Sequence, residues 1–298
     1  MNSLAVQFHG VSKRYPHFAL EEVSFDLPTG TIMGFIGANG AGKSTTMRIL
    51  MGLANQDSGT VTVLGHEVPA AAAMVKQQIG YVSEDMRLFP NATLEWHMAF
   101  VARVFGTWHP DYAATLIRRF DLRPSQRLKG MSHGQRIKSA LLLALARKPR
   151  LLVLDEPTTG LDPVARQEVI GALAEAVQDE QRTVLFSSQN TLDVEQIADR
   201  ITFIDRGRIV DADDKEQYLD RWRRLRLELP MNGVVPELDH LVSTTIAGRT
   251  ATLTTDRFSE QQLVACSAAG ATVHAVDRMT LEEIFVAAVM ARRNEVSA

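Results

Sequence analysis

The sequence predicts an α/β fold with a parallel sheet, and three observations carry that prediction. Short apolar runs, which fit buried strands, alternate with segments of helical spacing. One run, residues 31–36, stops at a glycine-rich turn that leads into the helical pattern of residues 44–53. Further on, the helical stretch 163–177 separates the apolar runs 151–154 and 183–187. Strands joined by such crossover helices build a parallel sheet, so this order favours an α/β core.

Patterns outside this core predict the other elements. Residues 4–8 and 20–27 alternate apolar and polar side chains, as half-buried strands do. Helical spacing dominates from about residue 90 to residue 145, with Pro110 and Pro124 as punctuation, which predicts a helical subdomain. The character then changes, so we expect a main domain, residues 1–213, and a small C-terminal α+β domain, residues 214–298. In that domain we expect strands over 224–229, 251–254 and 272–276 and helices over 259–269 and 280–292.

Composition limits the classes of protein to which this chain can belong. Its 298 residues are 45% hydrophobic and 22% charged, which is typical of soluble globular proteins and excludes disordered or fibrous chains. The net charge of -3 gives no overall basic field, so no nucleic-acid partner is expected. A single cysteine, Cys266, cannot close an intrachain disulfide, which fits a reducing compartment. The best candidate for a membrane span, residues 139–146, is far too short, and the N-terminus lacks a secretion signal, so we expect a cytoplasmic chain.

A glycine loop, residues 37–45, reads GANGAGKST and matches the phosphate-binding pattern G-x-x-x-x-G-K-[ST]. It lies after a buried strand and before a helix, where glycines let the backbone amides and the helix N-terminus point at a phosphate. Lys43 is expected to reach the β- and γ-phosphates, and the Ser44 hydroxyl to hold Mg²⁺. The loop residues expected to contact the nucleotide are Gly37, Asn39, Gly40, Ala41, Gly42, Lys43, Ser44 and Thr45.

A second site is expected where residues 151–156, LLVLDE, end an apolar strand in two carboxylates. Alone, this pattern is more often a strand that ends in solvated charge. Because the chain also has the phosphate-binding loop with Lys43, a role of the two carboxylates in nucleotide chemistry is the better interpretation. Ligands bind at the carboxyl ends of the strands of an open parallel sheet. Asp155 is therefore expected to hold Mg²⁺ through water, and Glu156 to orient and deprotonate an attacking water. Together the two sites predict binding and hydrolysis of a nucleoside triphosphate.

The glycine loop, the segment MSHGQ at residues 131–135 and LLVLDEPTTGLDP at residues 151–163 together resemble the nucleotide-binding domain of ATP-binding cassette (ABC) transporters. The resemblance runs in order through about residues 3–212. It implies a P-loop NTPase core of the ABC type with a helical subdomain. It also implies that two such domains sandwich two ATP molecules head to tail, so that each ATP meets the glycine loop of one copy and the signature loop, residues 131–135, of the other.

The same resemblance implies roles for five further residues. Ser132, Gly134 and Gln135 would contact the γ-phosphate held by the other copy, from a helix N-terminus that suits an anion. Asp162 resembles the loop that communicates between the two sites. Tyr15 resembles the aromatic residue that stacks on adenine, with a simple turn aromatic as the alternative.

Three positions depart from the family pattern. Glu84 stands where most members have a glutamine that touches Mg²⁺ and senses the membrane subunit, and a carboxylate can also ligate Mg²⁺. Together with residues 85–100, it is similar to the branch that powers ABC-2-type exporters. His133 replaces the first glycine of the signature, so its side chain must point away from the phosphate or add a donor to it. Gln189 replaces a histidine that contacts the γ-phosphate, and because an amide cannot become a cation, we expect slower but not abolished turnover.

Two features of the C-terminal domain carry further interpretations. Residues 279–285, MTLEEIF, resemble the segment that closes many exporter-type ATP-binding subunits, which indicates a regulatory or dimer-stabilising domain. An arginine run around Trp222 fits either a contact with phosphate, lipid or RNA or, more often, a solvated helix-to-strand junction. The run consists of Arg221, Arg223, Arg224 and Arg226.

We therefore expect an ATP-binding and ATP-hydrolysing subunit that uses ATP and Mg²⁺, dimerises around ATP and powers transport, in the direction of export. The dimer would be a homodimer or a heterodimer at the cytoplasmic face of the membrane. A separate integral membrane permease would dock beside Glu84 and the helices of residues 91–128. Two alternatives are kept: a hydrolysis-impaired regulatory cassette that pairs with an active subunit, and a soluble ABC ATPase that acts on a macromolecule.

Overall fold

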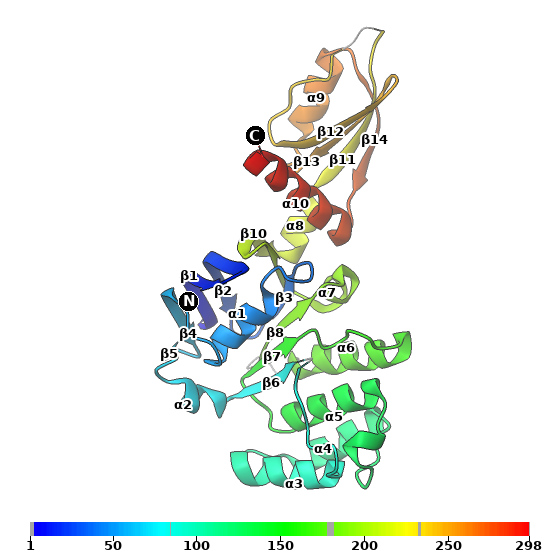
Figure 1. Ribbon diagram of the computed structural model, residues 1–298. Coiled ribbons are helices and arrows are strands. Elements are labelled where there is room, and N and C mark those ends of the chain that lie inside the picture. Colours follow the sequence, from blue (N-terminus) through cyan, green and yellow to red (C-terminus); the bar gives the residue numbers. More distant parts are fainter. Residues whose placement is uncertain (1–2, 84, 178–181, 232–233, 298) are drawn as a thin grey trace. The chain divides into compact units, whose positions relative to one another are not determined.

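The chain forms two compact units, Met1–Ala212 and Asp213–Ala298 (Figure 1). The first combines a six-stranded sheet, a four-stranded antiparallel sheet and helices, and the second has a four-stranded antiparallel sheet of its own. The α/β class with an added C-terminal α+β part is thus confirmed. Among the helices of the described residues, none has both the length and the apolar character that a membrane span requires. The computed structural model describes residues 3–83, 85–177, 182–231 and 234–297.

The six-stranded sheet consists of five short, mostly buried strands and one strand, β10, without buried residues. The strands are β3 (Ile32–Ile36), β6 (Ile79–Ser83), β7 (Leu151–Asp155), β8 (Thr183–Ser188), β9 (Arg200–Asp205) and β10 (Arg208–Asp214). Their order is β10-β9-β3-β8-β7-β6, and the five strands from β9 to β6 run parallel. The register pairs Ile36 with Ser188 and Asp155 with Ser187. The glycine loop, the Asp-Glu pair and residue 189 therefore all leave the sheet at the same edge.

The antiparallel sheet of the first unit contains β1 (Leu4–Tyr15), β2 (Phe18–Pro28), β4 (Ser58–Val63) and β5 (His66–Val68), in the order β2-β1-β4-β5. Strand β1 is longer than the predicted strand, which ended at Phe8. Its pairing with β2 is irregular between Phe8 and Val11, where Gly10 has a φ of 59°. Such an irregularity changes the face to which side chains point, so the alternation in the sequence stops there although the strand continues.

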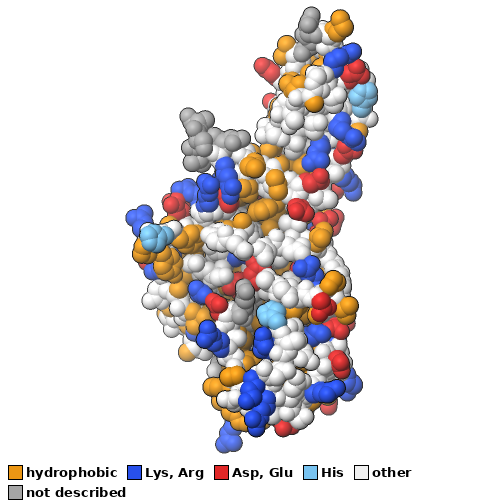
Figure 2. Space-filling view, turned by 45° about the vertical axis from the view of Figure 1, so that its right-hand side comes forward, with side chains coloured by type: hydrophobic (Ala, Val, Ile, Leu, Met, Phe, Trp, Pro, Cys, Tyr) orange, Lys and Arg blue, Asp and Glu red, His pale blue; other side chains and the backbone are white. Residues whose placement is uncertain are grey.

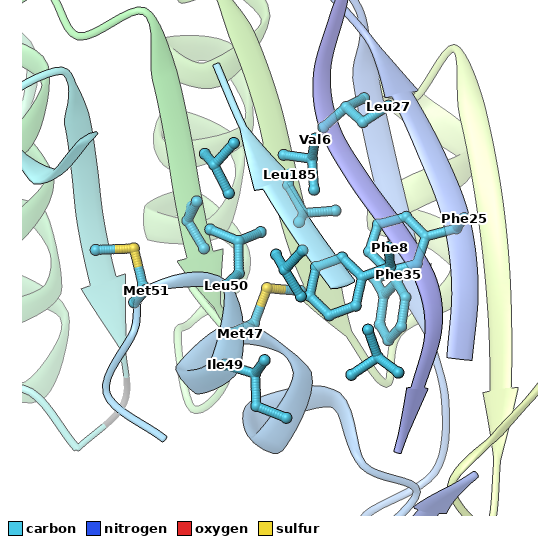
Figure 3. Packing of buried hydrophobic residues seen from close by; sticks show 14 of the residues in the cluster. Val6, Phe8, Phe25, Leu27, Phe35, Met47, Ile49, Leu50, Met51 and Leu185 are labelled. Atoms are coloured by element: carbon cyan, nitrogen blue, oxygen red, sulfur yellow. The ribbon is translucent and has the colours of Figure 1, made fainter. Parts of the chain in front are cut away.

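Aromatic rings fasten the antiparallel sheet to β3, the strand that leads into the glycine loop. Phe8 of β1 stacks on Phe25 of β2 with ring centroids 4.7 Å apart, and Phe25 lies 5.3 Å from Phe35 of β3. Figure 3 shows these rings beside Met47, which comes from helix α1 (Lys43–Leu50). Ring pairs at these distances add to the stability that their buried area provides, so the base of the glycine loop is rigidly supported.

The helical subdomain comprises α3 (Leu94–Phe105), α4 (Pro110–Arg119) and α5 (His133–Leu145). Pro110, expected to punctuate the helical stretch, occupies the first turn of α4, where a missing N–H costs nothing. The Thr93 hydroxyl caps α3 by accepting from the amide of Trp96. The remaining helices of this unit, within the described residues, are α2 (Ala72–Lys76), η1 (Leu128–Gly130), α6 (Pro163–Val177) and α7 (Thr191–Ile197).

A buried arginine ties the helical subdomain to β6. The Arg147 guanidinium follows α5, donates to the carbonyl oxygens of Gln77 at 2.8 Å and Ile79 at 3.0 Å, and lies 3.4 Å from the ring centroid of Phe105. Burial lowers the pKa of Arg147 to about 10, which leaves the group charged at neutral pH. Carbonyl oxygens and an aromatic face thus compensate the buried charge.

The second unit folds around its own small core. Its elements are α8 (Lys215–Arg221), β11 (Arg223–Glu228), β12 (Leu241–Ala247), β13 (Thr250–Thr255), α9 (Glu260–Ala268), β14 (Thr272–Arg278) and α10 (Leu281–Ser297). The sheet order is β12-β13-β11-β14, and Leu225 and Leu227 of β11 pack with Cys266 in the core. The predicted three strands and two helices are present, and two elements were missed, β12 and α8.

The arginine run is a junction between α8 and β11. Trp222, between these elements, is 2% exposed. Arg224 Nη1 lies 3.0 Å from Glu283 Oε1, and Arg226 Nε lies 2.8 Å from Asp277 Oδ2. Because these guanidinium groups have acidic partners within the unit, the structure favours a junction over a contact with phosphate, lipid or RNA.

Candidate nucleotide-binding and hydrolysis site

Two positions of the glycine loop leave no room for a side chain. A Cβ atom at Gly37 would lie 2.6 Å from the carbonyl oxygen of Ile204. Gly42 has a φ of +114°, and a Cβ there would lie 2.6 Å from Leu20 and 2.9 Å from the ring of Phe18. Gly42 also precedes α1 without a side-chain cap, so the first amides of α1 are available to an anion.

Lys43 is a buried ammonium group directly behind this loop. It is 5% exposed, and its Nζ donates to the carbonyl oxygens of Gly37 at 2.7 Å and Ala38 at 3.1 Å. The same Nζ lies 3.0 Å from Glu156 Oε1. The structure therefore brings together the lysine of one predicted site and the carboxylate of the other.

The loop opens into a cavity of about 460 Å³ that joins both predicted sites. Two lining residues, His17 and Phe18, were missed by the sequence interpretation, although they directly follow the predicted Tyr15. Tyr15 is 40% exposed and lies beside Lys13, with 5.7 Å from Nζ to the ring centroid, and is not among the described lining residues. The lining comprises His17, Phe18, Asn39, Gly40, Gly42, Lys43, Ser44, Thr45 and Glu156.

One buried hydroxyl, that of Ser187, contacts both residues of the Asp-Glu pair at the end of β7. Ser187 Oγ donates to Asp155 Oδ1 at 2.6 Å and accepts from the amide of Glu156 at 3.0 Å. Glu156 has a φ of 55°, a conformation that L-residues rarely adopt and that clusters at functional sites. Ser187 was not predicted, and its only signal is a hydroxyl residue within the apolar run of β8.

Further polar groups contact the Glu156 carboxylate. Oε2 accepts from the Thr159 hydroxyl at 2.8 Å and from the backbone amide of Gln189 at 3.4 Å. The Gln189 side chain itself is exposed. The carboxylate of Glu156 is thus fixed from two sides, by Lys43 at Oε1 and by Thr159 at Oε2.

The oxygen donors at this edge fit a magnesium ion. Mg²⁺ is usually bound by one or two carboxylates together with substrate phosphates and water. Ser44 lines the cavity, and Asp155 ends the strand beside β8, so a hydroxyl and a carboxylate are available. Glu84, the third predicted ligand, lies outside the described residues.

The signature loop leads into α5 through a capping box. Ser132 Oγ accepts from the amide of Gln135 at 3.2 Å, and Gln135 Oε1 accepts from the amide of Ser132 at 3.0 Å. A Cβ at Gly134 would lie 3.5 Å from Leu161. Both side chains that were expected to reach a phosphate therefore also hold the first turn of α5.

Asp162 holds the start of α6 in a similar way. Its Oδ1 accepts from the amides of Val164 and Ala165, both at 2.9 Å. The amides of Ala165 and Val164 hold the pKa of Asp162 below its ordinary value. Within one chain, Asp162 and the signature residues are not among the described residues that line the cavity.

The fold and the glycine loop together define an ABC-type P-loop ATPase. The profile of the family described as ABC transporter matches residues 20–159. A solved structure described as the ATP-binding subunit of an ABC transporter is similar with a TM-score of 0.67 and 27% identity, over 73% of this chain and 92% of that chain.

Two curated relatives define the family more closely. The Nod factor export ATP-binding protein I of Rhizobium etli is 33% identical over 222 residues, which cover 72% of this chain and 70% of that protein. The linearmycin resistance ATP-binding protein LnrL of Bacillus subtilis is 28% identical over 291 residues, which cover 93% of each chain. The chain belongs to the ABC transporter family and is an ATP-binding subunit of it.

Proposed function

We propose that this chain binds and hydrolyses Mg²⁺-ATP as a dimer and powers export through a separate membrane permease. The observation that carries the proposal is the Glu156 carboxylate, fixed between Lys43 and Thr159 at the mouth of the glycine loop. A general base needs this fixed position to accept a proton from an attacking water. The names of the two relatives, which describe export of Nod factor and resistance to linearmycin, support the direction of export.

Each residue of the site then has a distinct task. The amides of the glycine loop and of the first turn of α1 bind the phosphates, and Lys43 neutralises their charge. Ser44 and Asp155 would hold Mg²⁺, which neutralises charge on the phosphate oxygens. Glu156 orients the water and takes its proton. Gln189 donates its backbone amide to Glu156, and its side chain lacks the charge that a histidine could supply, which supports slower turnover.

The dimer is proposed from the signature loop. The first amides of α5 form a second anion-binding N-terminus, and Ser132 and Gln135 order it. Since the loop lies outside the cavity of its own chain, a phosphate held by another copy is the ligand that its chemistry fits. A homodimer and a heterodimer are both compatible with this arrangement.

The permease site is proposed at an apolar groove of about 430 Å³ between α3, α5 and β6. Phe89, Trp96 and Phe100 are 59%, 45% and 48% exposed. The ring of Trp96 stacks on Phe100 at 5.4 Å and meets the ring of Phe89 edge-on at 5.5 Å. Exposed aromatic clusters of this kind mark protein interfaces. Figure 2 shows hydrophobic and basic side chains side by side at the end of the first unit where α3 and α4 lie.

The docking proposal places the chain against the membrane and is tested by sedimentation. The chain is expected to pellet with membranes only when an ABC-2-type permease is co-expressed. Substituting Trp96 and Phe100 by serine should abolish this pelleting, whereas Val264→Ser, which changes an apolar residue of the second unit that is even more exposed, should not. Equal pelleting with and without the permease would contradict the proposal.

A hydrolysis-impaired regulatory cassette is the second candidate, and Gln189 is the observation that favours it. The fixed carboxylate of Glu156 favours hydrolysis instead, because a degenerate site has no need to retain a buried base beside a buried lysine. Hydrolysis of ATP by the purified chain above the rate of the Glu156→Gln variant would separate the two. A chain that binds ATP but never exceeds that variant would be the regulatory cassette.

A further inference from the structure

We propose that Thr159 and His133 are positioning residues for Glu156, and that they connect the signature loop of a chain to the catalytic carboxylate of the same chain. The Thr159 hydroxyl holds the carboxylate, and the His133 imidazole holds the backbone of Thr159. The inference rests on the proposed function, because it takes Glu156 as the group that orients the attacking water.

The first link is the hydrogen bond from Thr159 to Glu156. Thr159 Oγ1 donates to Glu156 Oε2 at 2.8 Å, whereas the amide of Gln189 reaches the same oxygen only at 3.4 Å. A hydrogen bond at 2.8 Å is well formed, and one at 3.4 Å is weak. Thr159 is therefore the main partner of Oε2 among the described residues, and its loss would free the carboxylate to rotate about its contact with Lys43.

The second link is the contact from His133 to Thr159. His133 Nε2 lies 3.1 Å from the carbonyl oxygen of Thr159. A carbonyl oxygen only accepts hydrogen bonds, so Nε2 carries the proton. This contact settles the orientation of the signature histidine within one chain, because its Nε2 donor is directed at the Thr159 carbonyl.

The His133 ring also lies against the residue that follows Thr159. The next residue, Gly160, has a φ of +71°, and a Cβ there would lie 3.3 Å from two atoms of the His133 ring. Beside it, Leu161 lies 3.5 Å from the position of a Cβ on Gly134. Two neighbouring residues of the loop 157–162 thus pack on two neighbouring residues at the start of α5.

These contacts connect the two ATP sites of the proposed dimer. A ligand of the signature loop displaces or steadies the first turn of α5. His133 passes this change in position to Thr159 and so to Glu156 Oε2. The chain thereby has a physical route by which a phosphate bound at one site adjusts the base of the other. A glycine at position 133 could not make this contact, because it has no side chain.

The hydroxyl is tested with three variants of Thr159. Thr159→Val keeps the shape but removes the donor, Thr159→Ala removes both, and Thr159→Ser restores the donor. We expect kcat for ATP to fall about tenfold in the valine and alanine variants, since misplacing a catalytic group by about 1 Å can cost up to 100-fold. The serine variant should recover most of the rate, and KM and the Kd for ATP should stay within about twofold. A valine variant with the wild-type kcat, or one changed only in KM, would overturn the role.

The histidine is tested by a double-mutant cycle. His133→Ala should lower kcat by a smaller factor than Thr159→Val, and His133→Gln, which retains a donor, should recover part of it. In the Thr159→Val background, His133→Ala should have no further effect, because residues that act through one another are not additive. Additive effects would show that His133 acts elsewhere, for example on the nucleotide, and would overturn the link.

A readout apart from activity tests the contact itself. In a chain labelled with ¹⁵N-histidine, the neutral His133 ring should be the Nε2–H tautomer, identified by loss of its signals in His133→Gln. An Nδ1–H tautomer would overturn the contact. A wild-type chain that does not hydrolyse ATP would instead remove the proposed function and with it the positioning role. Active wild-type protein with an unchanged Thr159→Val variant would remove the inference alone.

Discussion

Charged groups are placed differently in the two units of the chain. In the first unit, Lys43, Asp155 and Glu156 are 5%, 5% and 8% exposed. Lys43 begins α1, Asp155 ends the parallel strand β7, and Glu156 follows it. In the second unit, the ion pairs of Arg224 with Glu283 and Arg226 with Asp277 have side chains 34–56% exposed.

This difference distinguishes charged residues that serve the chemistry of the site from charged residues that stabilise the fold. Burying an ionised group is unfavourable unless its partners compensate, whereas an exposed ion pair changes the stability by only about 0–1 kcal/mol. The first unit therefore retains buried charge at a cost that stability alone does not explain. Among the described residues of the second unit, no charged side chain is buried to that extent. Variants that change buried groups of the first unit should have large effects on function, and variants of the surface pairs of the second should have small effects on stability.

The largest effect is expected for Lys43→Met. The buried ammonium group contacts Gly37, Ala38 and Glu156, and removing one partner of a buried charge interaction typically costs 2–5 kcal/mol, so affinity for ATP should fall about 100-fold. Isothermal titration calorimetry measures this change. Lys148→Met is the matched control, because Lys148 is exposed and precedes β7 at the opposite end of that strand, and it should keep wild-type affinity. Equal losses in both variants would contradict the account.

A pair of buried serines gives the next effect. Ser187 bonds to Asp155 Oδ1 and to the amide of Glu156, whereas the hydroxyl of Ser139, equally buried, bonds among the described residues to the sulfur of Met131 at 3.4 Å. Ser187→Ala should lower the free energy of unfolding by about 1–3 kcal/mol, because two buried polar groups lose their partner. Ser139→Ala should change it by much less, because sulfur is a weak acceptor. Chemical denaturation compares the two, and a larger loss for Ser139→Ala would refute the role of Ser187.

The sequence predicts the parts of this site that are contiguous in the chain. The glycine loop, β7 with its two carboxylates and the helix 163–177 follow from local pattern, because each is a strand, a turn or a helix of its own. Long-range contacts do not follow from such patterns. Two of the missed contacts join residues 26 or more positions apart, namely Ser187 with Asp155 and His133 with Thr159. A third, the ring of Phe18 beside Gly42, depends on how the turn before Phe18 folds.

Two strands show a second gap, one at the edge of its sheet and one in the interior. The strand β12 was missed because its side chains from residue 243 onward are exposed, so no buried face imposes an apolar alternation on the sequence. The strand β1 was shortened because the irregular pairing near Gly10 breaks its alternation. Burial of one face of a strand produces the apolar alternation in the sequence. In β12 this burial is weak, and in β1 the buried face changes at the irregular pairing.

A moderate effect is expected for Gln189→His. The imidazole can become a cation and donate to a developing charge, so turnover of ATP should rise about threefold to tenfold, the range that up to about 1.4 kcal/mol provides. Gln189→Asn is the matched control, since it keeps an amide and the backbone bond to Glu156, and it should not exceed the wild-type rate. Steady-state phosphate release measures both. An unchanged rate in Gln189→His would remove the claim that glutamine slows the enzyme.

The smallest effect belongs to the second unit. Glu283 Oε2 accepts from the amide of Thr280 at 2.9 Å, and this bond, with Arg224 nearby, holds the pKa of Glu283 below its ordinary value. A carboxyl group with a lowered pKa stabilises the fold above its unfolded pKa, and this stabilisation is lost as the pH falls through the folded value. Glu283→Gln should therefore cost about 0.5–1 kcal/mol at pH 7 and nothing at a pH below both values.

Denaturation at several pH values checks this prediction. Glu282→Gln is the matched control, because Glu282 lies in the same first turn of α10 but is exposed. A Glu283→Gln variant whose cost stayed constant from neutral to acidic pH would show that charge has no part in this cap.

The most direct test of the account is the specific ATPase rate of the purified chain as a function of its concentration, with Glu156→Gln as the blank. The account predicts that the rate per chain rises with concentration, because the signature loop of a second copy completes each site. It also predicts a loss of at least about 100-fold in Glu156→Gln, the usual contribution of a general base, and wild-type behaviour in the exposed control Glu67→Gln. A rate per chain that is independent of concentration, or that survives Glu156→Gln, would contradict it.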